Sequence, residues 1–216
     1  MNSDKTISNK IVSSVKLSLE EQWKYSTEFW IEILLRVCKT LAEDMGLGWD
    51  KVNQALLESA KNGWPGVLKV IEKLDLTYRD ARIWASTEAF AGVNAWPGYI
   101  DEVTEFSSKR TAIKGHGPSE GGRCVILDIA IKLNLDKKID LASWCAANAD
   151  AYLRSINSKL RFIQEKAMCR GDTYDYGYAE LVDFEVKESK HAYEKLKPFK
   201  EFQESELEAY GKKHKK

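Results

Sequence analysis

The first ninety-odd residues place their hydrophobic side chains at helical spacing. Ser18 and Glu21 stand three residues apart ahead of an apolar run, which is the pattern of a capping box at a helix start. Along the segment that follows, apolar residues recur at spacings of seven, four, three and four: Trp23, Trp30, Leu34, Val37 and Leu41. Because residues at these spacings share one face of a helix, we expect this stripe, with its two tryptophans, to face the core.

Three more helices follow in the same half of the chain. Asp50 is placed to cap the second helix, Pro65 suits the first turn of a short third helix, and Thr77 opens the fourth. We therefore predict a flexible tail over residues 1–16 and an all-helical half over residues 17–95.

The pattern changes after Trp96-Pro97-Gly98. Residues 102–114 are rich in Thr, Ser, Val and Phe, which predicts one strand or a broken pair of strands. A glycine-containing loop then leads to Cys124 and a short apolar helix, and Asp140 is placed to cap another helix.

Residues 159–181 indicate two strands joined by a tight turn. Gly171 supplies the positive φ that the turn Arg170-Gly171-Asp172 requires, and tyrosines alternate with other residues after it. A continuous helix over residues 140–168 is the competing interpretation. The alternating tyrosines favour the hairpin, and residues 96–182 then form an α+β half.

Beyond Asp183 the chain is charge-balanced with helical spacing, interrupted at Pro198, which predicts a charged helical tail over residues 183–216. No linker separates two domains. The predicted fold is a single helix-rich α+β domain with a small antiparallel sheet that includes the hairpin.

Composition and charge exclude several classes of protein. Of the 216 residues 44% are hydrophobic, which is too many for a disordered chain, and 31% are charged. Lys plus Arg and Asp plus Glu number 33 each, so no net field recruits nucleic acid or an anionic membrane. No apolar stretch is long enough for a signal peptide or a membrane span. The four cysteines lie far apart, so we expect reduced thiols and a cytoplasmic protein.

Residues 20–182 resemble the L-2-amino-thiazoline-4-carboxylic acid hydrolase family. The resemblance rests on Gly121-Gly122-Arg123-Cys124, on a helical Cys145 followed by Asp150, and on the hairpin turn from Gly171-Asp172 to Tyr178. It implies a hydrolase that opens a carbon–nitrogen bond in a small cyclic amidine. The chain departs from the family pattern after the turn, where Tyr174 and Asp175 stand in place of a cysteine and Cys169 lies before the turn.

The chemistry of such a reaction needs a nucleophile, a proton carrier and an anchor for the substrate carboxylate. A thiolate is the strongest nucleophile available near neutral pH, and Cys124 is the first candidate because it lies at the start of a predicted helix. The catalytic candidates are Cys124, His116, Asp172, Cys169 and Cys145. The substrate-binding candidates are Arg123, Tyr174, Tyr176 and Trp144.

Each candidate also has a structural interpretation. A free cysteine is more often inert packing, and an aspartate in a Gly-Asp turn more often bonds the turn backbone. A zinc site made of His116 and the three later cysteines is a further alternative, but the closely spaced ligand pair that marks zinc sites is absent. We therefore predict neither a metal nor a cofactor, and we expect His191 and His214 to lie in solvent.

The sequence thus favours a small-molecule hydrolase and keeps two alternatives. One is a non-catalytic module that binds a small ligand in the same fold. The other is a structural or partner-binding helical protein that uses the charged C-terminal helices, with a homodimer as one form, because proteins with long amphipathic helices commonly associate.

Overall fold

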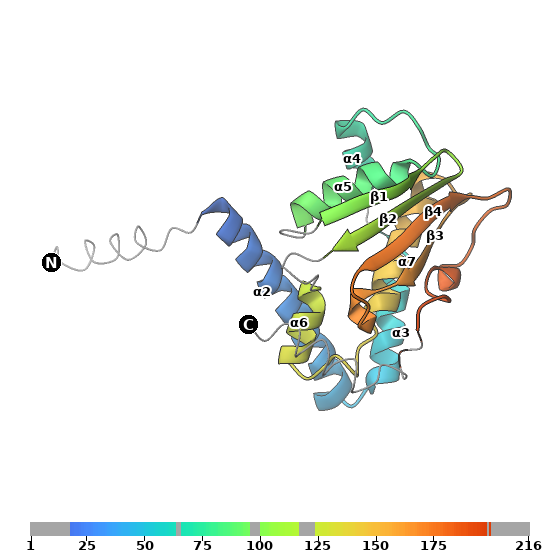
Figure 1. The fold of residues 1–216 in the computed structure, drawn as a ribbon. Helices are drawn as coiled ribbons and strands as arrows, with labels where there is room; N and C mark the ends of the chain where they lie inside the picture. Colours follow the sequence, from blue (N-terminus) through green and yellow to red (C-terminus); the bar gives the residue numbers. More distant parts are fainter. Residues whose placement is uncertain (1–17, 64–65, 96–99, 117–123, 198, 200–216) are drawn as a thin grey trace, which may run out of the picture.

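In a computed structural model of the chain, residues 18–63, 66–95, 100–116, 124–197 and 199 are described here. Six α-helices and one four-stranded antiparallel sheet make up most of these residues, in an α+β arrangement (Figure 1). The predicted fold class is therefore confirmed. None of the described helices combines the length and the apolar composition that crossing a membrane requires.

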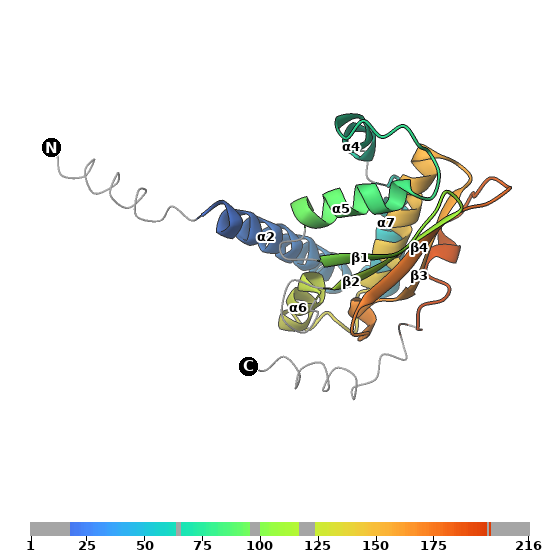
Figure 2. The same ribbon diagram turned by 45° about the horizontal axis from the view of Figure 1, so that its top comes forward.

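The helix α2 (Leu19–Lys39) begins as its sequence predicts. The Ser18 hydroxyl accepts a hydrogen bond from the Glu21 amide, and the Glu21 carboxylate accepts one from the Ser18 amide, which completes the capping box. A short π-helix, η1 (Thr40–Asp44), continues α2 without a break. The N-terminal half of α2 projects away from the rest of the molecule in both ribbon views (Figures 1 and 2).

The helices α3 (Trp49–Ala60), α4 (Val67–Lys73) and α5 (Ile83–Ala95) follow. The chain leaves α3 at Gly63, whose φ of 58° and close approach to the backbone of Tyr152 on α7 (Leu141–Ile156) both require glycine. Pro65, which we expected in the first turn of α4, lies outside the described residues.

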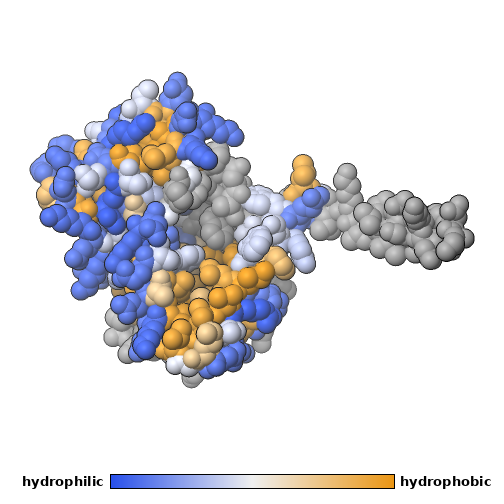
Figure 3. Space-filling view, turned by 180° about the vertical axis from the view of Figure 1, so that it is seen from behind, coloured by the Kyte–Doolittle hydropathy of each residue, from blue (hydrophilic) through white to orange (hydrophobic). Residues whose placement is uncertain are grey.

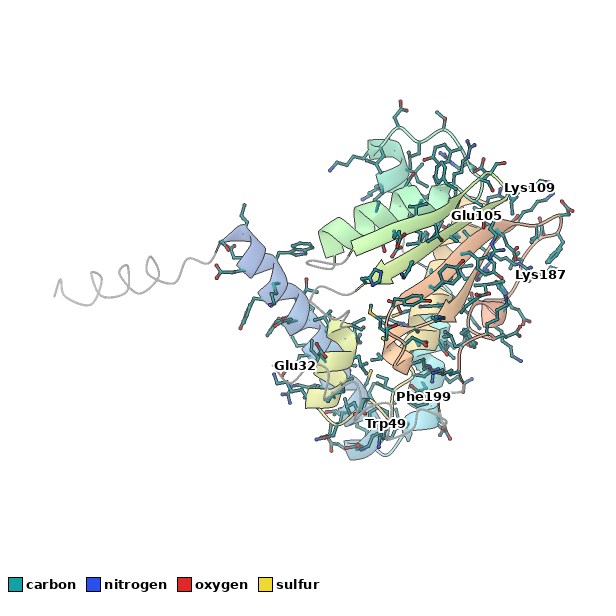
Figure 4. All side chains as sticks on the ribbon, in the orientation of Figure 1. Glu32, Trp49, Glu105, Lys109, Lys187 and Phe199 are labelled. Atoms are coloured by element: carbon teal, nitrogen blue, oxygen red, sulfur yellow. The ribbon has the colours of Figure 1, made fainter. Side chains whose placement is uncertain are left out.

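The sheet has the order β1-β2-β4-β3 and every neighbouring pair is antiparallel. The strands β1 (Ile100–Phe106) and β2 (Arg110–His116) form one hairpin, so the broken pair of strands is confirmed. Figure 4 shows Glu105 and Lys109 near the turn of this hairpin.

The strands β3 (Leu160–Lys166) and β4 (Asp175–Leu181) form the second hairpin. Between them lies the 3₁₀ turn η2 (Met168–Arg170), and Gly171 follows in the left-handed conformation with φ 83°. The predicted hairpin is confirmed, and the competing helix is excluded because Asn157, the residue after α7, is already extended.

Two hydrophobic cores hold these elements together. The first lies between one face of the sheet and the helices α4, α5 and α7, and Trp84 stacks there on Tyr152 and Phe162. The second is built by α2, α3, the start of α7 and the helix α6 (Val125–Lys132). Figure 4 places Glu32 beside α6, where its carboxylate accepts a hydrogen bond from Lys132.

The expectation that the whole apolar stripe of α2 faces the core is wrong for Trp30 and Val37, whereas Leu34 and Leu41 pack against the second core. The side chains that enter the second core are Ile31, Leu35, Cys38 and Ala42, which lie on the neighbouring face of the helix. Trp30 and Val37 are 64% and 50% exposed. Spacing alone identifies residues that share a face, but it cannot tell which of two apolar faces meets the core.

The segment after β4 is described as far as Lys197. It is mostly irregular and contains one 3₁₀ turn, η3 (Lys190–Ala192), where we expected a helix. It lies against α7 and the edge strand β3, and the Val186 amide donates to the Ser158 carbonyl over 2.8 Å. These tertiary bonds satisfy the backbone in place of a helix. The remainder of the predicted helical tail, residues 200–216, lies outside the described residues.

Candidate functional site

Three cysteines from distant parts of the chain lie at the edge of the second core. Cys124 is the N-cap residue of α6, Cys145 lies on α7, and Cys169 lies in η2. The Cys124 and Cys169 sulfurs are 3.1 Å apart, and all three thiols are half-buried. The position of Cys124 at a helix start is therefore as predicted, and the fold brings Cys169 to it from the other side of the hairpin.

The surroundings of two of these thiols favour the protonated form. Burial raises the pKa of Cys145 well above its usual value, and the nearby Cys124 and Asp175 add to the rise. The pKa of Cys169 is raised well above its usual value as well, first by its hydrogen bond to Cys124 and then by burial. Neither thiol is therefore a ready nucleophile near neutral pH.

Carboxyl groups gather close to the thiols. Burial raises the pKa of Glu88 on α5 to about 8, with further contributions from the charges of Asp101 and Asp175. Burial likewise raises the pKa of Asp101 on β1 to about 6, and Asp175 again contributes. Because a carboxyl with a pKa of about 8 is mostly neutral near pH 7, the negative potential at Cys145 and Cys169 comes first from Asp175 among these carboxyl groups. Such a potential opposes both a thiolate and the negatively charged carboxylate of the predicted substrate.

Two further catalytic candidates, Asp172 and His116, lie at the hairpin turn and at the end of β2. Asp172 accepts a hydrogen bond from the Ala167 amide over 2.9 Å and so closes the hairpin turn, which is the structural role that a Gly-Asp turn favours. His116 ends β2, and its ring lies 6.1 Å from that of Tyr174, measured between centroids.

The substrate-binding candidates have the following surroundings. Tyr174 accepts a hydrogen bond from Lys166 over 2.6 Å, and Tyr176 packs against a small cluster on the sheet face away from α7. Trp144 packs against the second core, and its buried indole nitrogen has no hydrogen-bond partner among the residues that the structure describes. Arg123 lies outside the described residues.

Within the described part of the chain, no three His, Cys, Asp or Glu side chains are arranged to hold a metal ion. The zinc alternative therefore finds no support among these residues. The absence of a cofactor stays a prediction.

A buried ionic network was missed by sequence reasoning. Asp150 is fully buried on α7 and accepts hydrogen bonds from Arg154, from the Phe162 amide and from the His191 Nε2, at 2.7–2.9 Å. The expectation that His191 lies in solvent is wrong. Its partner stands 41 residues away along the chain, and no local pattern announces such a contact. A second contact that was not predicted is the hydrogen bond that the buried Arg170 donates to Asp140, the residue before α7.

The helix α2 exposes several large apolar side chains to solvent. These side chains are Leu19, Tyr25, Phe29, Trp30 and Val37. Seen from behind, a hydrophobic area covers the lower part of the molecule on the side where α2 lies (Figure 3). Exposed apolar surface of this extent usually marks a site of interaction.

No family model and no curated protein matches this chain. Among solved structures, the chain is similar to the crystal structure of a trafficking protein particle complex subunit 3 from Naegleria fowleri covalently bound to palmitic acid. The TM-score is 0.52 at 13% sequence identity, and the match covers 76% of this chain and 99% of that chain. At this identity the likeness shows a shared fold.

These findings correct the predicted activity. The structural neighbour is a subunit of a protein complex, not a hydrolase, and the surroundings of the thiols oppose the predicted chemistry. The prediction of a carbon–nitrogen hydrolase is therefore wrong. The family resemblance on which it rested is not tested by the comparisons and stays a prediction.

Proposed function

We propose that this chain is a non-catalytic subunit that assembles with a second copy of itself through a partly exposed apolar stripe of α2, and that it acts by binding protein partners. The observation that carries the proposal is the exposure of Trp30 and Val37, at 64% and 50%, on a helix whose other face already fills the core. We call the set Trp23, Trp30, Leu34, Val37 and Leu41 the α2 stripe.

The spacing of the α2 stripe suits a second helix. Intervals of seven, four, three and four residues are those of a heptad repeat, in which two helices pack along a narrow apolar seam. Leu34 and Leu41 are half-buried against the second core, whereas Trp30 and Val37 extend outward beside them. Tryptophan is also the residue type most often found to dominate the energy of a protein–protein contact.

A second copy is the partner that the stripe itself fits. When two α2 helices run antiparallel with the twofold axis at Glu32, Trp23 lies opposite Leu41 and Trp30 lies opposite Leu34. Each of these two aromatic side chains then meets a smaller aliphatic one, and Val37 lies opposite Thr27. A parallel pair would place Trp on Trp and leave gaps beside the smaller residues.

The charge of the molecule permits this pairing. The chain carries 33 basic and 33 acidic residues, so two copies do not repel each other over long distances. Along α2, the first half carries Glu20, Glu21 and Glu28 against Lys24, and the second half carries Arg36 and Lys39 against Glu32. An antiparallel pair sets the acidic half of one copy beside the basic half of the other. The trafficking complex subunit with a similar fold supports an assembling role in the same sense.

Sedimentation equilibrium of three proteins tests the proposal: the unmodified chain, Trp30→Ala and Phe106→Ala. Phe106 on β1 is a matched control because it is also aromatic and 56% exposed, yet lies away from α2. The unmodified chain and Phe106→Ala should sediment as dimers of about twice 24.6 kDa, and Trp30→Ala should shift toward monomer. A monomeric unmodified chain, or equal weakening by both substitutions, would overturn the proposal.

A further inference from the structure

The sulfur atoms of Cys124 and Cys169 lie close enough for a small movement to allow a disulfide bond. Their sulfurs are 3.1 Å apart, although the residues are separated by 45 positions along the chain. A disulfide bond is about 2.05 Å long, so the two sulfurs need to approach by about 1 Å. Both cysteines are half-buried residues at the edge of the second core.

We propose that Cys124 and Cys169 form a reversible disulfide when the protein meets a peroxide, and that this disulfide ties α6 to the β3–β4 turn. The assignment concerns a modification site and does not depend on the α2 stripe, since neither cysteine lies on α2.

The reaction balances without any further reagent. The Cys124 sulfur attacks one peroxide oxygen, the O–O bond breaks, and the products are a sulfenic acid on Cys124 and one water. The Cys169 sulfur then attacks the Cys124 sulfur, the S–O bond breaks, and a second water leaves with the Cys169 proton. Two thiols lose two electrons in total, and hydrogen peroxide is reduced to two waters.

The other two cysteines are poor competitors for this bond. Cys38 is buried in the second core on α2, and burial raises the pKa of its thiol. Burial raises the pKa of Cys145 well above its usual value, so its thiol keeps its proton. Cys169 also keeps its proton in the resting state, because its hydrogen bond to Cys124 raises its pKa. Cys124 is therefore the sulfur expected to attack the peroxide, and Cys169 the one that resolves the sulfenic acid.

The bond would connect two parts of the fold that otherwise meet through packing alone at this point. Cys124 begins α6, which packs on α2, and Cys169 belongs to the turn between β3 and β4. Closing a loop of this length restricts the unfolded chain, so the oxidised protein should melt at a temperature about 5–10 °C higher than the reduced one.

The experiment exposes the unmodified protein to increasing hydrogen peroxide, blocks the remaining thiols with iodoacetamide, and maps the peptides by mass spectrometry. We expect one cross-linked peptide pair that contains Cys124 and Cys169, lighter by two hydrogens than the reduced pair and restored by dithiothreitol. The melting temperature should rise with its yield. The variant Cys38→Ser should give the same cross-link, and Cys169→Ser should lose both the cross-link and the rise.

Any one of three results would overturn the proposal. Iodoacetamide could alkylate both thiols after every peroxide treatment, Cys124 could be oxidised to sulfinic acid without a cross-link, or the cross-link could join a different pair of cysteines. The mapping uses the unmodified chain, so a variant that folds poorly cannot obscure the answer.

Discussion

Replacement of Asp150 by Asn is the change to which the stability of the fold should be most sensitive. The Asp150 side chain is fully buried and joins three elements: Arg154 on α7, the backbone of Phe162 on β3, and His191 in the segment after β4. An asparagine has nearly the same shape, but its amide group is a donor on one side and carries no charge. At least one of the three donors would then face another donor, and the half-buried Arg154 would lose its counter-charge.

The magnitude follows from the burial of the pair. Breaking a buried ion pair by removing one partner costs about 3–5 kcal/mol, because the remaining charge is left uncompensated. For a domain of this size, about 1 kcal/mol lowers the melting temperature by about 2–4 °C. We therefore expect Asp150→Asn to reduce the free energy of unfolding by about 3 kcal/mol or more and the melting temperature by about 6–12 °C.

The pH dependence gives an independent test of the same contacts. Burial alone would raise the pKa of Asp150, but the hydrogen bonds from His191, Phe162 and Arg154 outweigh it, and the pKa is lowered. The contribution of Asp150 is therefore fully present above its unfolded pKa of about 3.9 and is lost as the pH falls through the lower folded value. The difference between wild type and variant should shrink in acid.

Urea unfolding at pH 7 and at several values between pH 3 and pH 5 measures both effects. Asp44→Asn is the matched control, since Asp44 is exposed at the end of η1. A loss below about 1 kcal/mol at pH 7, or an equal loss in the control, would refute the reasoning.

Three further predictions concern other parts of the molecule. Gly63→Ala should lower the free energy of unfolding, measured in urea, by about 2 kcal/mol or more, because the φ of Gly63 is +58° and the new Cβ would lie 2.7 Å from the Tyr152 backbone nitrogen. The control Gly46→Ala has a similar φ but open space around it, so it should lower the free energy of unfolding by less. Equal losses in the two variants would contradict this account. Glu88 has a pKa of about 8 in the folded protein, above its unfolded value, so the free energy of unfolding of the wild type should fall between pH 5 and pH 8. In Glu88→Gln this decrease should be smaller by about 2–4 kcal/mol. The control Glu72→Gln changes an exposed residue and should leave the decrease unchanged. An equally steep fall in Glu88→Gln would contradict the burial of that carboxyl. Trp30→Ala should weaken dimerisation by about a thousandfold, because truncating such an anchor costs about 2 kcal/mol or more in each copy, and sedimentation that gives less than a tenfold change would argue against the α2 stripe.

The local features of the fold could be predicted from the sequence. The capping box at Ser18, the cap at Asp140 and the left-handed Gly171 depend on residues within three or four positions of one another. These interactions form within a single turn, so the local sequence pattern is enough to predict them. The two hairpins and the α+β class follow from the same kind of local signal.

The contacts between distant segments could not be predicted in this way. The Asp150–His191 and Cys124–Cys169 contacts span 41 and 45 residues, and each depends on how α7, α6 and the hairpin pack. The α2 helix shows the same limit, because Ile31 and Leu35 define one apolar face, Trp30 and Val37 define another, and only packing decides which is buried. The candidate site was affected most. Cys124 was placed correctly at a helix start, but the charge of Asp175, which helps to raise the pKa of Cys145 and Cys169, comes from β4.

The central claim, that the α2 stripe is covered by a second copy, is tested most directly by hydroxyl-radical footprinting of the unmodified chain at a series of concentrations. Dimerisation should protect Trp30 and Val37 from oxidation as the concentration rises, whereas Phe106 and Phe184, which are also exposed, should be oxidised equally throughout. Oxidation of Trp30 at the same rate in dilute and concentrated protein would contradict the account.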